Sequence, residues 1–258
     1  MYFDLTLTRN LTAVAALCAQ FLIAPAATAA GESREWVPDI LGFKLGMPLN
    51  DVTARMNALN IKPNAVPQRV RSNIGEYTSG ITAVPTALDS NDAGIFRFRF
   101  SPPPRSDRIV HVDRQVDYAK LPGKAPMASD LESALVKKFG APTGRQGPNG
   151  LIWIWSPAGK LQTRGLGTPC DMLAGNLEGE RPNVQPHALK VVQSGCGVVM
   201  KAFITPAPSG VVTKLSHQAV DVAGGVEAWQ AAQAAAADQA GQKNQQDADR
   251  ARQQKPSI

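Results

Sequence analysis

The stretch Gly94-Ile95-Phe96-Arg97-Phe98-Arg99-Phe100 alternates strictly between apolar and charged side chains. Successive side chains of a β-strand point to opposite faces, so the three phenylalanines share one face and the two arginines share the other. Residues 101–107 contain three prolines, which can neither continue a strand nor donate to a ladder, and they predict a loop. Alternation resumes over 108–118, so the sequence predicts an antiparallel pair of strands.

The second strand of this pair is expected to carry its apolar side chains on one face. That face would hold Val110, Val112, Val116 and Tyr118, with Arg114 among them, and the other would hold His111, Asp113 and Asp117. A buried guanidinium needs a carboxylate or a carbonyl partner, so Arg114 is interpreted as an internal tie rather than as a binding residue.

A short amphipathic helix is predicted before this pair of strands, over 49–59. Its apolar residues recur at steps of three and four, which places them on one helical face. Pro48 suits the first turn, where its missing N–H costs nothing, and Asp51 complements the positive end of the helix.

A second helix is predicted over 126–140, with its apolar residues again on one face. Gly140, followed by Pro142, is expected to end the helix. Ser129 and Glu132 have the spacing of a capping box.

The remaining strands are predicted downstream of the second helix. Residues 151–155 are apolar on both faces, so that strand is expected to be central or covered. Its Trp153 and Trp155 share one face, where core packing is favoured over the lining of a ligand groove. Strands over 196–204 and 211–220 complete a meander.

Together these elements predict an α+β fold of two related units, each a short helix packed on an antiparallel β-meander, followed by a C-terminal helix. The two sheets are expected either to stay separate or to form one continuous sheet. The first unit would span 31–120 and the second, with a disulfide, 121–224. The Ala- and Gln-rich segment 225–258 is expected to form a partly helical, fraying tail, or to order against a partner.

The composition is that of a globular protein. The chain has 258 residues, of which 43% are hydrophobic and 19% charged, and a formal net charge of +6. These values exclude a collagen, a polytopic membrane protein and a wholly disordered chain. The positive charge favours association with anionic surfaces, but it specifies no partner.

Residues 1–30 are predicted to be a secretory signal peptide. Arg9 supplies positive charge, residues 11–23 form an apolar run, and 26–30 offer small residues for cleavage. An uncleaved anchor is the alternative interpretation. No later apolar run is long enough for a transmembrane span, so none is expected in the mature chain. The protein is therefore expected in the periplasm or outside the cell.

Two cysteines remain after such a cleavage, Cys170 and Cys196. An oxidising compartment favours a disulfide between them. A redox role is disfavoured because there is no C-x-x-C motif, and zinc is disfavoured because two cysteines without a matched histidine pair do not make a four-ligand site.

Two motifs resemble those of known proteins. Leu45-Gly46-Met47-Pro48 enters a short helix, and 135–142 closes a helix with Phe-Gly-Ala-Pro before an aromatic strand. This pattern resembles the tandem helix-then-meander modules of the small-protein-A outer-membrane-assembly lipoproteins and of the β-lactamase inhibitor proteins. The sequence is also similar to uncharacterised exported proteins of proteobacteria. It lacks the lipidated cysteine of the lipoproteins, and no site residue is transferred from either family.

No strong catalytic signature is found. The G-x-S-x-G, P-loop and H-E-x-x-H patterns are absent, so no catalytic residue, cofactor or metal is predicted. His111, His187 and His217 lie far apart in the sequence, and satisfied or exposed structural positions are expected for them rather than roles as base or ligand.

One group of residues is a candidate site. Arg97, Arg99, Arg105 and Arg108 concentrate in the predicted hairpin, and arginine grips carboxylate or phosphate with two parallel bonds. We therefore consider them a candidate anion-binding group. The alternative is a solvated strand face balanced by Asp107, Asp113 and Asp117.

These features predict a non-catalytic envelope or secreted protein that binds a protein partner or an anionic surface through its sheet or its tail. Nucleic acid is not expected as a partner, given export and the lack of an aromatic-basic platform. The alternatives are a periplasmic hydrolase with a site assembled from scattered residues, and a secreted enzyme inhibitor, which rests on fold analogy.

Overall fold

The computed structural model describes residues 37–64, 66–72, 75–86, 94–121, 123–163, 170 and 185–253. The predicted signal peptide, 1–30, lies outside the described residues. The first elements are β1 (Asp39–Ile40), β2 (Phe43–Lys44), α1 (Leu49–Ala58), β3 (Ile61–Pro63), β4 (Gln68–Ser72), β5 (Gly75–Pro85), β6 (Ile95–Phe100), β7 (Ile109–Asp117) and the 3-10 helix η2 (Tyr118–Lys120). The later elements are α2 (Ala128–Phe139), β8 (Gly144–Gln146), β9 (Gly150–Trp155), α4 (Gln185–Gln193), β10 (Val198–Pro206), β11 (Val212–Asp221) and α5 (Val222–Gln253).

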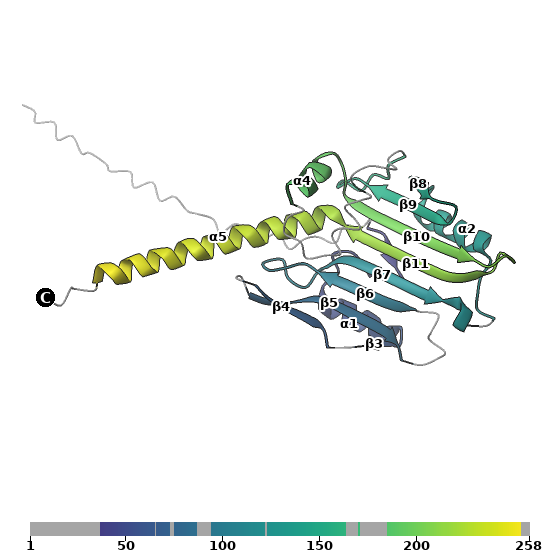
Figure 1. The fold of residues 1–258 in the computed structure, drawn as a ribbon, viewed down its shortest axis with the longest axis horizontal. Coiled ribbons are helices and arrows are strands. Elements are labelled where there is room, and N and C mark those ends of the chain that lie inside the picture. Colours follow the sequence, from purple (N-terminus) through teal and green to yellow (C-terminus); the bar gives the residue numbers. More distant parts are fainter. Residues whose placement is uncertain are drawn as a thin grey trace, which may run out of the picture. The chain divides into compact units, whose positions relative to one another are not determined.

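Nine strands form one antiparallel sheet, which confirms the predicted α+β class (Figure 1). The strand order is β3-β5-β6-β7-β11-β10-β9-β8, and β4 pairs with β5 beside this path. The last strand of each half, β7 and β11, pair with each other, so the two meanders share one continuous sheet. Each half presents a helix followed by a meander, and that the halves are two related units stays a prediction.

The predicted pair of strands forms as β6 and β7, with one correction to the second strand. The register passes from Arg99 opposite His111 to Phe100 opposite Ile109, so a bulge lies at Val110. Ile109 is therefore fully buried, whereas Val110, which was expected on the apolar face, is only half-buried. A bulge adds one residue to one strand and reverses the alternation beyond it, which a simple period of two does not anticipate.

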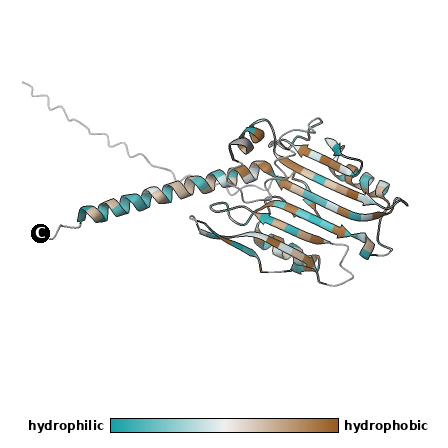
Figure 2. Ribbon diagram, in the orientation of Figure 1, coloured by the Kyte–Doolittle hydropathy of each residue, from teal (hydrophilic) through white to brown (hydrophobic). Residues whose placement is uncertain are grey.

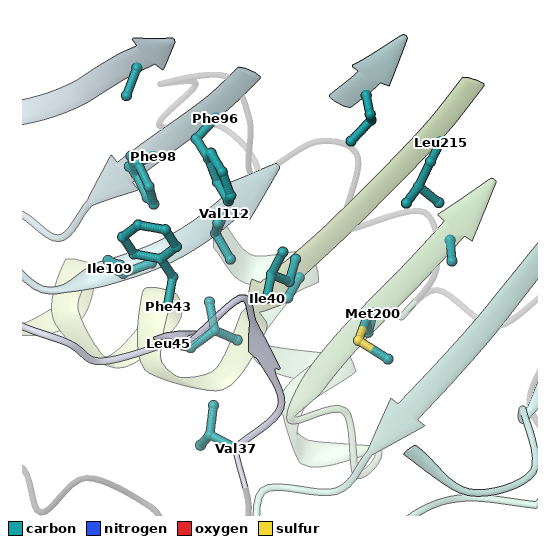
Figure 3. Packing of buried hydrophobic residues seen from close by; sticks show 14 of the residues in the cluster. Val37, Ile40, Phe43, Leu45, Phe96, Phe98, Ile109, Val112, Met200 and Leu215 are labelled. Carbon is teal, nitrogen blue, oxygen red and sulfur yellow. The ribbon is translucent and has the colours of Figure 1, made fainter. Parts of the chain in front are cut away.

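The larger core lies between the sheet and the layer formed by α1, α2 and the β1–β2 hairpin. Phe43 of this hairpin places its ring 4.9 Å from that of Phe96 and 4.8 Å from that of Phe98. Figure 3 shows the three rings together, with Ile40 of the same hairpin reaching toward the second half of the sheet. The phenylalanine face of 94–100 is thus the core face, as its alternation predicts.

Helix α2 ends as predicted but begins differently. Gly140 has a φ of 84°, in the left-handed region that favours glycine, and its N–H donates to the carbonyl of Val136. The predicted capping box does not form, because Met127 occupies the N-cap position and Ser129 already lies inside the helix. Glu132 instead pairs with Arg145.

Strand β9 is buried on both faces, as predicted. Trp153 and Trp155 belong to the larger core, so the core interpretation of this pair is confirmed. Ile152 and Ile154 point the other way, into a second core formed with α4 and the start of α5. The predicted disulfide between Cys170 and Cys196 is present, with a Cα–Cα distance of 5.6 Å, and both cysteines belong to this second core.

The C-terminal segment forms a longer continuous helix than the partly helical tail that was expected. Val222, Ala223, Val226 and Ala228 are buried, whereas every residue from Ala237 to Gln253 is exposed. Figure 2 shows the corresponding change from hydrophobic to mostly hydrophilic residues along α5. Within the described ranges, no helix combines the length and the hydropathy that crossing a membrane requires.

Candidate binding face

The two faces of the sheet differ in what covers them. One face packs on α1, α2 and the hairpin, and α4 and the start of α5 cover the other face mainly over β9, β10 and β11. Beyond that cover, polar side chains follow each other across paired strands. We call this region the open face, and it comprises Thr82, Arg97, Arg99, Asp113, Gln115, Lys214, Ser216 and Gln218.

Arg97 and Asp113 stand directly opposite each other on the open face. Nη1 of Arg97 donates to Oδ2 of Asp113 at 2.8 Å, and Nε2 of Gln115 donates to the same oxygen at 3.1 Å. Burial raises the pKa of Asp113, and hydrogen bonds from Arg97, Gln115 and Ser216 oppose that rise without cancelling it. The Arg97 side chain remains 48% exposed, so the guanidinium has a surface toward solvent.

Arg99 lies one pleat along the same strand and reaches the sheet edge. Its Nη1 donates to Oε1 of Gln68 at 2.6 Å. The guanidinium passes over Gly80, where a Cβ would come within 3.0 Å of Nη1 and 3.2 Å of the Phe98 carbonyl oxygen. A glycine at this position therefore leaves the space through which Arg99 reaches β4.

His111 is buried beside these arginines. Its Nε2 lies 3.0 Å from Nε2 of Gln218, a contact whose donor depends on the imidazole tautomer. Burial and the charges of Arg99 and Arg97 lower the pKa of His111 to about 4. The imidazole is consequently neutral near pH 7 and a weak base, and its chemistry is that of a hydrogen-bonding group.

His111 and His217 do not assemble into one site. His217 is on β11, next to the strand that carries His111, but it faces the larger core, where its Nε2 lies 3.2 Å from Sδ of Met200. Burial and the charges of Arg114 and Lys138 lower the pKa of His217 to about 3. His187 is on α4. Arg114 lies opposite His217 in the β7–β11 register and is half-buried, on the face that alternation predicts.

The four candidate arginines do not converge on one point. Arg97 and Arg99 share the open face. Arg105 lies in the loop between β6 and β7, and its Nη1 is 2.8 Å from Oε2 of Glu227 on α5. Arg108 donates to the carbonyl oxygen of Gly46, in the link between β2 and α1. Only Arg97 and Arg99 therefore contribute to a common surface.

Sequence reasoning missed Gln68, Gly80 and Gln218. Residues 211–220 were predicted to be a strand, and polar side chains alternate along it at Lys214, Ser216 and Gln218. That alternation could have placed Lys214, Ser216 and Gln218 on one face of the strand. Their position next to β7 depends on the pairing of β7 with β11, which joins strands from different halves of the chain and leaves no local signal.

The described residues bring no group of three or more metal-ligating side chains together. Comparisons of the chain with protein-family models, with curated proteins and with solved structures find no match.

Proposed function

We propose that the protein is a non-catalytic binding module of the cell envelope or the secreted fraction, which engages an anionic surface through the open face. The observation that carries this proposal is the placement of Arg97 and Arg99 two residues apart on the same face of β6, where the Arg97 side chain is 48% exposed. Among the described residues each donates one side-chain hydrogen bond to a neighbour, and a guanidinium has five N–H donors, so donors remain for phosphate or carboxylate oxygens.

The charge of the region supports an anionic ligand. Besides the two arginines, Lys201 and Lys214 lie on the same side of β10 and β11, and the carboxylates across from these cations are Asp113 and Asp117. Asp113 is largely occupied by hydrogen bonds from its neighbours. Among the described residues of these strands, cations therefore outnumber carboxylates, which favours attraction of anions at ordinary ionic strength.

The geometry gives less support to a hydrolase. A general base works best with a pKa near the operating pH, and the pKa of His111 is about 4. A secreted inhibitor remains an alternative without a supporting observation in the described residues.

The direct test compares retention on sedimented vesicles of anionic and of zwitterionic lipid. The Arg97→Gln/Arg99→Gln variant should lose most of the retention on anionic vesicles, and added salt should weaken retention of the unmodified protein. The control is Arg250→Gln/Arg252→Gln, which removes the same charge from the exposed end of α5. Retention that is equal in the two variants, or insensitive to salt, would contradict the proposal.

We further propose that residues 1–30 direct export and are removed. Protein recovered from the periplasm should have an intact mass that corresponds to loss of this segment. That mass should be two hydrogen atoms below the mass of the reduced form, because disulfide formation removes two protons and two electrons from the thiols. Full-length protein confined to the cytoplasm would refute export.

A further inference from the structure

Strand β4 lies at an edge of the sheet. In the part of the chain that the structure describes, it pairs with β5 alone, over Gln68 opposite Gly80 to Ser72 opposite Gly75. Every second residue of an antiparallel edge strand points its N–H and C=O away from its neighbour. Strand β4 therefore offers a row of backbone groups to an additional strand.

Two of the five residues of β4, Arg69 and Arg71, are basic, and an exposed apolar residue lies close by. Arg69 and Arg71 both lie across from the segment that contains Glu76, and this carboxylate pairs with Arg69 at 3.2 Å. The side chains of Arg69 and Glu76 are 70% and 54% exposed, so their ion pair is weak and readily exchanged. Val66, just before the strand, is 87% exposed.

We propose that this edge accepts an extended acidic segment of a partner protein, which adds to β4 as a further strand. The backbone of the partner would pair with the outward groups of β4, and its carboxylates would lie opposite Arg69 and Arg71. Opposite charges across neighbouring strands stabilise pairing, and like charges oppose it. An apolar residue of the partner would cover Val66.

Charge also decides against a second copy of this chain as the occupant. Two β4 strands placed edge to edge would bring arginines against arginines, which is the usual way in which an edge strand is protected from self-association. The same arginines favour an acidic strand, so one feature excludes one partner and selects another.

The test uses a short fluorescent peptide that alternates Glu and Val, with a Lys and Val peptide as its counterpart. Fluorescence anisotropy should show the acidic peptide binding about tenfold or more tightly than the basic one. The Arg69→Glu/Arg71→Glu variant should reverse this preference. The matched control, Arg250→Glu/Arg252→Glu, changes the charge by the same amount on α5 and should leave the preference unchanged.

Backbone pairing is tested separately from charge. Two forms of the acidic peptide carry N-methyl groups, one on the Glu nitrogens and the other on the Val nitrogens. Alternate N–H groups of a strand point to opposite edges, so strand addition requires that one methylated form loses binding and the other keeps it.

Three results would overturn this proposal: equal binding of both methylated forms, no binding of the acidic peptide, or a protein dimer that Arg69→Glu/Arg71→Glu abolishes. None of them depends on Arg97 and Arg99. Failure of strand addition is therefore distinguishable from failure of vesicle binding.

Discussion

Arg97 and Asp113 form a cross-strand ion pair on the open face, with Nη1 of the arginine 2.8 Å from Oδ2 of the aspartate. The two side chains differ in exposure, 48% for Arg97 and 12% for Asp113. The arginine thus neutralises a nearly buried carboxylate while part of its own side chain faces solvent. This asymmetry determines what its removal should cost.

Replacing Arg97 with Ala should destabilise the protein by about 1–3 kcal/mol, because it leaves the Asp113 carboxylate buried without its charged partner. The double variant with Asp113→Asn should recover part of that loss, since the carboxylate that needed the arginine is gone. Urea denaturation at neutral pH measures both variants against the unmodified protein.

The matched control for this pair is Arg69→Ala, which removes an arginine whose partner Glu76 is exposed. Exposed ion pairs contribute about 0.2–1 kcal/mol, so this variant should lose less stability than Arg97→Ala. Equal losses at both positions would show that burial of Asp113 does not control the energetics of the open face.

The stability of the protein should fall as the pH drops below 6.5. Burial lowers the pKa of His111 to about 4 and that of His217 to about 3 in the folded state, whereas both return to about 6.5 when the chain unfolds. The unfolded state therefore binds more protons below pH 6.5. The free energy of unfolding should decline by up to about 1.4 kcal/mol per pH unit for each histidine as the pH approaches 4.

The titration of Asp113 acts in the opposite direction. Its pKa is raised in the folded state, so just above pH 3.8 protonation of this carboxyl favours folding. The histidines are thus best isolated between pH 6.5 and 5. In that window His111→Gln should flatten the decline by up to one histidine's contribution, as measured by urea denaturation at several pH values. If the slope of unfolding free energy against pH were unchanged in His111→Gln, His111 would not have the lowered pKa that its burial implies.

Phe43 anchors the β1–β2 hairpin, and its truncation should be costly. The ring is fully buried against Phe96 and Phe98, so Phe43→Ala removes its contacts and leaves a cavity. We expect a loss of about 3–5 kcal/mol in the free energy of unfolding. Ile95→Ala, at a side chain that is 39% exposed, serves as the control and should cost far less. A small loss at Phe43 would mean that the hairpin does not contribute to the core.

The contrast between Phe43 and Phe96 shows what sequence patterns convey. Phe96 lies in an alternating strand, so its burial follows from a period of two. Phe43 lies in a two-residue strand with no periodicity, and only the tertiary structure shows that its ring packs on the phenylalanine face. The amphipathic helices α1 and α2 were likewise predicted from the period of their apolar residues, whereas β9 was predicted from a run that is apolar on both faces.

The helix cap and the contacts that were not predicted depend on residues that are distant in the sequence. Ser129 has the spacing of a cap, but Met127 takes the N-cap position and the Ala128 N–H donates to the carbonyl of Gly210, which is distant in sequence, so Ser129 lies inside the helix. For the candidate site, Arg97 and Arg99 were predicted on one face. Asp113 was among the carboxylates expected to balance the arginines, but its pairing with Arg97, and that of Arg99 with Gln68, could not be assigned, because register and edge pairing are set by the whole sheet.

The distal part of α5 should exchange its amide hydrogens much faster than its start. Val222 and Val226 are packed in the second core, whereas from Ala237 onward every side chain of the helix is exposed and contributes no burial. A helix that relies on propensity and on i,i+3 ion pairs such as Asp249 with Arg252 is only marginally stable in water. Hydrogen exchange followed by mass spectrometry should therefore show strong protection over 222–230 and little beyond 237.

Removal of 238–258 should leave the urea midpoint of the sheet unchanged. Protection that extends to Gln253 in the isolated protein would contradict this prediction, because it would indicate that the distal helix packs on another surface. Repeating the exchange at a series of protein concentrations would then show whether that surface belongs to a second copy of the chain.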